Sequence, residues 1–118
     1  MAVLSLALLA AAPVSAQMVR GFVSGALLRT WCTREEPLDV EACFSYLRGV
    51  FDSLSAMDSA SPGHPGGGVE LDCIPDRVSV TELRTVFRRY VAGHPESLVR
   101  QGSVVVLEAW AENYECGG

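Results

Sequence analysis

The sequence contains no lysine, and all nine of its basic residues are arginines. Fourteen acidic residues outnumber them, so the formal net charge at pH 7 is −5. Proteins that bind nucleic acids or anionic membranes carry an excess of positive charge, which attracts phosphate groups. The charge balance therefore argues against a nucleic acid or an anionic membrane surface as the partner.

Histidine is also scarce, since His64 and His94 are the only two in the chain. Neither of them stands near a candidate nucleophile in a recognisable motif. The cysteines lack the spacing of a zinc site, because no pair of them lies two to four residues apart. The sequence therefore predicts no catalytic residue, no metal site and no cofactor.

An uncharged apolar segment opens the chain. Residues 1–16 end in V-S-A, which fits the small-x-small pattern of a signal peptidase site, so we expect a secretory signal peptide cleaved after Ala16. A membrane anchor is the alternative, although the apolar run is shorter than the ~20 residues of a spanning helix. Residues 17–118 are then expected to form one periplasmic domain without membrane attachment.

Apolar residues recur at helical spacing in four parts of the mature chain. They predict helices over residues 19–32 and 39–57, between Ser79 and Gly93, and over residues 95–116. The run S-V-V-V-L at residues 103–107 leaves a short strand open as an alternative. Four helices with short connections in each half predict an all-α fold, a small four-helix bundle of two antiparallel hairpins.

The third predicted helix has a clear beginning and end. Ser79 and Glu82 form an S-x-x-E capping box, and Val78 and Leu83 stand where a hydrophobic staple would pack. Gly93 is expected to end the helix as a left-handed residue. The arginines of this helix are expected to lie mostly in solvent; they are Arg84, Arg88 and Arg89.

The second predicted helix carries a further stripe of mostly small residues beside its apolar face. Such a stripe suits close contact with another helix of the same chain, which is the more common case, or with a second copy of the protein. Its members are Ala42, Tyr46, Gly49, Ser53 and Ala56.

The four cysteines form an even set in an exported chain, which predicts two disulfides. Cys32 ends the first predicted helix and Cys43 lies near the start of the second. Cys73 precedes the third helix and Cys116 ends the fourth, and an antiparallel pair would bring these ends together. We therefore expect the bridges Cys32–Cys43 and Cys73–Cys116, while the two other connectivities remain open.

Several motifs resemble those of the periplasmic immunity proteins that protect bacteria from the amidase toxins of type VI secretion systems. They are C-x-x-Y-x-x-G at residues 43–49, C-I-P at residues 73–75 and G-H-P at residues 93–95. The resemblance spans nearly all of the mature chain. It implies an all-α, disulfide-bonded and often dimeric protein that binds a peptidoglycan amidase and blocks its active-site cleft. A periplasmic structural or chaperone-like helical protein is the alternative.

A segment rich in glycine and proline separates the two predicted hairpins. Residues 58–70 cannot hold regular structure, and they do not form a phosphate-binding loop because no lysine follows them and no strand precedes them. A protein that plugs a cleft needs a projecting segment with rigid ends, so we expect the loop from Asp58 to Asp72 to face the partner; a disordered connector is the alternative. The residues assigned to partner binding are Asp58, Ser61, His64, Glu70, Asp72 and Asp76.

Overall fold

The computed structural model describes residues 21–60 and 69–116, and every regular element among them is helical. The four α-helices are α1 (Gly25–Thr33), α2 (Pro37–Ala60), α3 (Val80–Gly93) and α4 (Gly102–Asn113), with two short 3₁₀ helices, η2 (Leu71–Cys73) and η3 (Pro95–Val99). The predicted all-α class is confirmed for this part of the chain. The predicted signal peptide and the site residues Ser61 and His64 lie outside the described residues.

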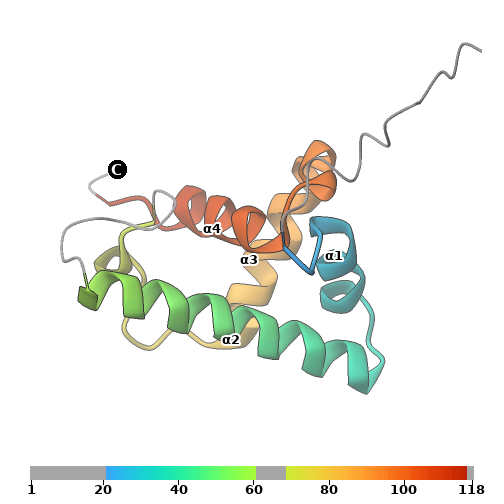
Figure 1. Cartoon of the computed structure of the whole chain (residues 1–118), viewed down its shortest axis with the longest axis horizontal. Coiled ribbons are helices and arrows are strands. Elements are labelled where there is room, and N and C mark those ends of the chain that lie inside the picture. Colours follow the sequence, from blue (N-terminus) through green and yellow to red (C-terminus); the bar gives the residue numbers. More distant parts are fainter. Residues whose placement is uncertain (1–20, 61–68, 117–118) are drawn as a thin grey trace, which may run out of the picture.

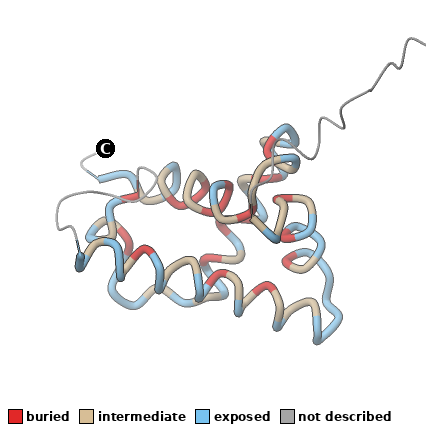
Figure 2. Tube along the Cα trace, viewed as in Figure 1, coloured by how far each residue is buried: buried red, intermediate tan, exposed pale blue. Residues whose placement is uncertain are grey.

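Figure 1 shows α2, the longest helix, running beneath α1 and α4, with α3 passing behind it. The most extensive contacts join α1 to α2 and α3 to α4. Buried positions lie on the sides of α2 and α4 that face the middle of the molecule (Figure 2). All four helices thus contribute to one core, while their arrangement as two antiparallel hairpins stays a prediction.

Helix α1 begins later than the apolar pattern predicted. The hydroxyl of Ser24 accepts the backbone N–H of Leu27 at 3.1 Å and caps the helix. Just around the cap, backbone bonds join the chain to the segment before α4, with Gly25 N donating to Arg100 O at 2.8 Å and Gly102 N donating to Val23 O at 2.7 Å. Residues 21–24 are therefore not helical as predicted, and Phe22, which precedes this contact, is fully exposed.

Gly25 allows a close approach between α1 and η3. A Cβ atom added there would lie 2.8 Å from the backbone oxygen of Ser97, so a larger residue would push η3 away from α1. Ser97 is itself fully buried, and its hydroxyl donates to the backbone oxygen of His94 at 2.6 Å. The contact at Gly25 is therefore made with a 3₁₀ turn and not with another α-helix.

Helix α2 extends beyond both predicted ends. Pro37 opens it, which suits the first turn of a helix because proline has no backbone N–H to leave unpaired. At the other end the helix continues to Ala60, so Asp58 lies in its last turn. The prediction that residues 58–60 lack regular structure was wrong.

The predicted start of α3 and its end at Gly93 are confirmed, whereas the predicted left-handed conformation of Gly93 was wrong. Glu82 N donates to the hydroxyl of Ser79 at 3.1 Å. Gly93 is the last residue of α3, and its φ does not fall in the left-handed region. The helix ends because Pro95 disfavours the helical conformation in the residue before it, and His94 has φ −133° and ψ 66°.

The last predicted helix is divided in two. Pro95–Val99 form η3, and α4 begins at Gly102 after a break in which Gln101 pairs with Ser24 in an isolated bridge. The run S-V-V-V-L lies inside α4, so the alternative of a strand was wrong. The break exists because the backbone around Arg100 bonds to the start of α1 and leaves the helical pattern.

Arg84 is not a solvent-facing residue as predicted, since only 11% of its side chain is exposed. Its Nε donates to the backbone oxygen of Cys32 at 2.8 Å, and its Nη2 lies 3.3 Å from a carboxylate oxygen of Glu35. Its guanidinium also lies over the ring of Phe44. Carbonyl groups in the last turn of a helix lack partners within that helix, so Arg84 joins α3 to the end of α1. Arg88 and Arg89 are exposed, as predicted.

Both expected disulfides are formed, and no cysteine is free. The Cα atoms of Cys32 and Cys43 lie 5.0 Å apart, and those of Cys73 and Cys116 lie 5.3 Å apart. Cys32 and Cys43 are fully buried, whereas Cys73 is half-buried and Cys116 is exposed. We refer to Cys32–Cys43 as the buried bridge and to Cys73–Cys116 as the exposed bridge.

Candidate partner-binding surface

The candidate surface is built on residues 69–76, here called the return segment, which leads the chain back toward α3. Val69 and Ile74 anchor it in the core, with 1% and 3% of their surfaces exposed. Between these anchors the chain makes the turn η2, in which Cys73 N donates to Glu70 O at 3.0 Å. Two buried anchors and a hydrogen-bonded turn fix the segment, so that Glu70 and Asp72 project from a defined backbone.

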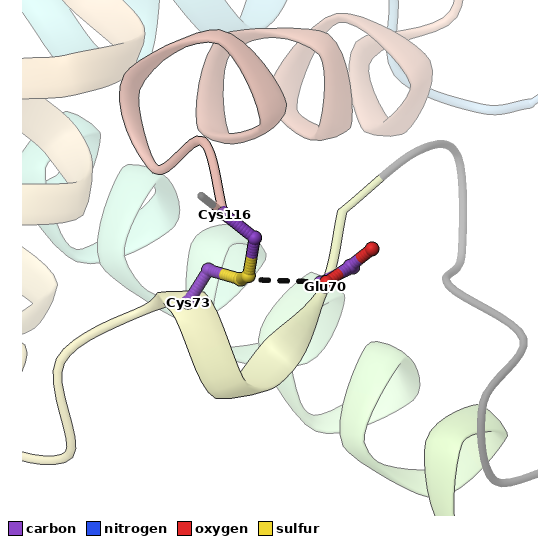
Figure 3. Close-up of side chains that lie close together, drawn as sticks. All are labelled: Glu70, Cys73 and Cys116. Carbon is purple, nitrogen blue, oxygen red and sulfur yellow. Dashed lines mark hydrogen bonds between the residues drawn. A yellow bond between two sulfur atoms is a disulfide. The ribbon is translucent and has the colours of Figure 1, made fainter. Parts of the chain in front are cut away.

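The exposed bridge joins the return segment to the residues after α4. Figure 3 shows the carboxylate of Glu70 beside this bridge, with Oε2 3.5 Å from the Sγ atom of Cys73. A disulfide sulfur carries no hydrogen, so the contact places negative charge near the sulfur and is not an S–H hydrogen bond. The side chains of Glu70, Cys73 and Cys116 could together ligate a metal ion by their spacing, but both sulfurs are consumed in the disulfide.

Asp76, the last residue of the return segment, differs from Glu70 and Asp72 in its surroundings. It lines a pocket of about 340 Å³ together with Arg48 and Asp52 of α2. The rest of the lining is apolar and comes from Phe51, Val78, Val80 and Leu83. Sequence reasoning missed Asp52, because it is an ordinary polar position on the helical pattern and only the fold brings it to the same pocket as Asp76.

The remaining predicted partner-binding residues contribute less to this surface. Asp58 is half-buried in the last turn of α2. Ser61 and His64 fall outside the described residues, so their role stays a prediction. The acidic residues that the structure describes here are therefore Glu70, Asp72 and Asp76 on the return segment and Asp52 on α2, and the last two of these line one pocket.

A second hollow lies between α2 and α4. It has a volume of about 510 Å³, and no charged side chain lines it. Three members of the small-residue stripe line it, and two of these, Gly49 and Ser53, are exposed. The lining residues are Ser45, Tyr46, Gly49, Val50, Ser53, Met57, Ser103 and Leu107. This part of the stripe therefore faces an open groove and is not packed under another described helix.

A polar cluster connects α3, η3 and α4. The hydroxyl of Tyr90 donates to Glu108 at 3.0 Å, and the guanidinium of Arg100 donates to both oxygens of the same carboxylate. Burial, and then the hydrogen bond to Glu108, raise the pKa of Tyr90 above its ordinary value. The hydrogen bond to Glu108 also raises the pKa of Arg100. These groups satisfy one another, so the cluster fastens the segment before α4 to α3.

His94 belongs to the same region. Its ring stacks on Tyr90 with the ring centres 4.1 Å apart, and its Nδ1 lies 2.9 Å from the backbone oxygen of Tyr90. The side chain of His94 therefore contacts α3, and it makes no capping hydrogen bond to η3.

The family model of the Rap1a immunity proteins matches residues 24–116, from the cap of α1 to the last cysteine. A search of curated proteins and a search of solved structures each found no match. Among the described helices, none combines the length and the apolar character needed to cross a membrane.

Proposed function

This chain belongs to the Rap1a immunity protein family, and from that membership we propose that it binds and inhibits a secreted peptidoglycan amidase of a type VI secretion system. The observation that carries the proposal is the family match across all four helices and both bridges. Immunity proteins act against a toxin partner by binding it. We propose that this chain protects by covering the active-site cleft of the amidase, without a catalytic step of its own.

The return segment supports this mode of binding. A segment that enters a cleft binds with less loss of conformational entropy when it is already ordered. Val69, Ile74 and the exposed bridge supply this order. The carboxylates of Glu70 and Asp72 suit a basic rim around the cleft, and charge of this kind accelerates association more than it tightens the final complex.

We further propose that the protein acts in the periplasm after removal of residues 1–16. Two disulfides with no free cysteine fit an oxidising compartment. The substrate of the proposed toxin, peptidoglycan, also lies outside the cytoplasmic membrane. Periplasmic fractionation with mass determination of the mature N-terminus tests both the location and the cleavage site.

The uncharged groove between α2 and α4 supports a homodimer. The chain carries a net charge of −5, so two copies repel one another across most of their surfaces. At the groove no charged side chain is present, and exposed Gly49 and Ser53 let a partner helix come close. Light scattering should therefore show a dimer, and Ser53→Arg should give a folded monomer, whereas Arg88→Ser on the exposed face of α3 should not.

The test of the function is protection of cells. Candidate type VI amidases are directed to the periplasm of a host that also expresses this chain with its leader. The cognate amidase should lyse cells only when the chain is absent, and purified chain should abolish its hydrolysis of peptidoglycan. Protection against a secreted toxin that does not cleave peptidoglycan would retain an immunity function and would exclude the amidase as target.

The contribution of the acidic surface is tested with a matched pair of variants. Glu70→Gln with Asp72→Asn should slow association with the cognate amidase about threefold to tenfold at low salt, and the difference should shrink as salt rises. Glu36→Gln with Glu96→Gln removes the same charge from exposed positions elsewhere and should change the rate much less. Equal effects of the two pairs would show that only net charge matters.

A further inference from the structure

The two bridges differ in how easily a reductant can reach them. Thiol–disulfide exchange begins when a thiolate attacks a disulfide sulfur, so the rate depends on access to that sulfur. Cys32 and Cys43 have no exposed surface, whereas Cys116 is exposed and Cys73 is half-buried. A dissolved dithiol can therefore reach the exposed bridge in the folded protein, but it can reach the buried bridge only after the core opens.

We propose that the exposed bridge is a reducible latch, which holds the return segment in its binding conformation and releases it when an exported dithiol opens the bridge. This regulation rests on the proposed function, because the return segment is the proposed partner-binding surface. The buried bridge is not part of the switch. It keeps α1 and α2 joined in both redox states.

The exchange proceeds at the more accessible sulfur. A thiolate of the dithiol attacks Sγ of Cys116 and forms a mixed disulfide, the Cys73–Cys116 bond breaks, and its electron pair goes to Sγ of Cys73, which takes a proton from water. The second thiol of the reductant loses its proton and attacks the mixed disulfide, so that Cys116 leaves as a thiolate and is protonated. The bridge gains two electrons and two protons, and the dithiol becomes a disulfide.

Glu70 slows this step through its negative charge. Its carboxylate lies 3.5 Å from Sγ of Cys73, which is the sulfur that receives negative charge when the bridge breaks. It also repels an incoming thiolate. Two like charges about 4 Å apart in water interact weakly, so the expected effect is a reduction rate about fivefold lower than without the carboxylate.

Opening the bridge removes one of the supports of the return segment. Val69 and Ile74 remain as apolar anchors, but η2 is a single turn that cannot hold itself without tertiary support. The residues after α4 lose their disulfide cross-link to the return segment. The helices keep the core, the buried bridge and the contacts of Arg84.

The first experiment follows the two bridges during reduction. Oxidised full-length mature protein is treated with rising concentrations of dithiothreitol at neutral pH, alkylated and mapped by peptide mass spectrometry. Cys73 and Cys116 should be labelled at least tenfold faster than Cys32 and Cys43. Simultaneous labelling of all four cysteines, or earlier labelling of Cys32 and Cys43, overturns the proposal.

The second measurement is hydrogen exchange of the protein in which only the exposed bridge is open. Amide exchange should accelerate at least tenfold in residues 69–76, while α2 and the helical circular dichroism spectrum stay unchanged. Cys73→Ser with Cys116→Ser should reproduce this state without reductant. Unchanged exchange in the return segment after selective opening shows that the bridge is not a latch and overturns the proposal.

Glu70→Gln tests the role of the Glu70 carboxylate, with Glu36→Gln as the control that removes the same charge elsewhere. Only the former should be reduced faster, by about fivefold, and the gain should shrink as salt screens the repulsion. Equal rates for both variants with dithiothreitol refute the role of Glu70.

Binding to the cognate amidase is measured last. If no amidase is bound in either redox state, the proposed function fails while the selective opening stands. Equal binding in both redox states overturns the regulation.

Discussion

The two disulfides of the molecule lie in opposite surroundings. The buried bridge joins α1 to α2 inside the core, and Arg84 covers the end of α1 beside it. The exposed bridge ties a single turn and the residues after α4 at the surface, beside the carboxylate of Glu70. One bridge is therefore part of the packing that makes the fold, and the other holds a surface segment in place.

Loop length alone predicts that the exposed bridge stabilises the fold more than the buried bridge does. They close sequence separations of 11 and 43 residues, and the chain-entropy treatment gives about 3 kcal/mol for the shorter loop and about 4 kcal/mol for the longer one. The difference between these two values is about 1 kcal/mol, which is no larger than the cost of leaving one polar group unpaired in the core, about 1–3 kcal/mol. Burial should therefore decide which bridge matters more for stability.

The largest expected effect comes from replacing each bridge by two serines. Cys32→Ser with Cys43→Ser should lose about 5 kcal/mol or more, because two hydroxyl groups enter a site with no exposed surface. Cys73→Ser with Cys116→Ser should lose about 4 kcal/mol at most, because its hydroxyl groups can reach water. Guanidinium unfolding measures both losses. Since domains of this size have a total stability of about 5–15 kcal/mol, the first variant should be close to unfolded.

The proposed difference between the two bridges is wrong if the losses of stability follow loop length and not burial. Replacing the same cysteines by alanine offers a further check, because alanine removes the bridge without burying a hydroxyl group. The two alanine variants should lie closer together in stability than the two serine variants. A larger loss at the exposed bridge in both series would show that loop closure dominates over burial.

The second expected effect concerns Arg84, which strengthens the end that holds the buried bridge. Arg84→Ala should cost about 2 kcal/mol, because it removes a charged donor from the carbonyl of Cys32 and uncovers the ring of Phe44. Arg88→Ala, four residues further along α3 at an exposed position, should change the stability by less than about 0.5 kcal/mol. Chemical unfolding of the two variants measures the difference, and similar losses would show that the contacts of Arg84 add nothing beyond what an exposed arginine of α3 contributes.

The sequence predicts the helices well and their ends poorly, for a physical reason. Each helix presents an apolar stripe that local periodicity reveals, and the cap at Ser79 is a local hydrogen bond. The late start of α1 and the break before α4 depend instead on backbone bonds between Gly25 and Arg100, which lie far apart in the chain. No pattern within either segment encodes such a contact.

The same limit applies to the surface. The pairing of the cysteines could be argued from the helix ends, and the acidic residues flanking the glycine-rich segment were visible as composition. Only the fold shows that Asp76 and Asp52 line one pocket, which Glu70 does not line. The predicted exposure of Arg84 was wrong, because a helical pattern shows which face of α3 a residue occupies but not which other helix lies against that face. Here the backbone oxygen of Cys32, in the last turn of α1, accepts a hydrogen bond from Arg84.

The third prediction compares the two capped helices. Ser24→Ala and Ser79→Ala should each cost about 1 kcal/mol, since each removes a hydroxyl that accepts a backbone N–H of the first turn. Ser24→Ala should lie at the upper end of the range, because α1 is the shorter helix and begins at the bonds to Arg100 and Gln101. Thermal unfolding of both variants measures this. No loss at Ser79 would mean that packing alone starts α3.

The smallest expected effect concerns the titration of Tyr90 and Tyr114. Tyr114 lies two residues before Cys116 of the exposed bridge. Burial is the first cause of the raised pKa of both, followed by Glu108 for Tyr90 and by Glu82 for Tyr114. A pKa that is raised in the folded state contributes stability that is complete below about pH 10, the pKa of an unfolded tyrosine, and is lost as pH rises through the folded pKa. Stability should therefore fall above about pH 10.

The two tyrosines should respond differently when the exposed bridge is removed. In Cys73→Ser with Cys116→Ser the residues after α4 are no longer tied, so Tyr114 should become more exposed and its titration should move down toward the ordinary value. Tyr90 should keep its raised pKa, because Glu108 and Arg100 lie on elements that the bridge does not hold. Tyrosinate absorbance during an alkaline titration measures both, with Tyr90→Phe and Tyr114→Phe to assign the signals. An unchanged titration of Tyr114 would show that α4 holds this residue by packing alone, and that the region controlled by the exposed bridge ends before it.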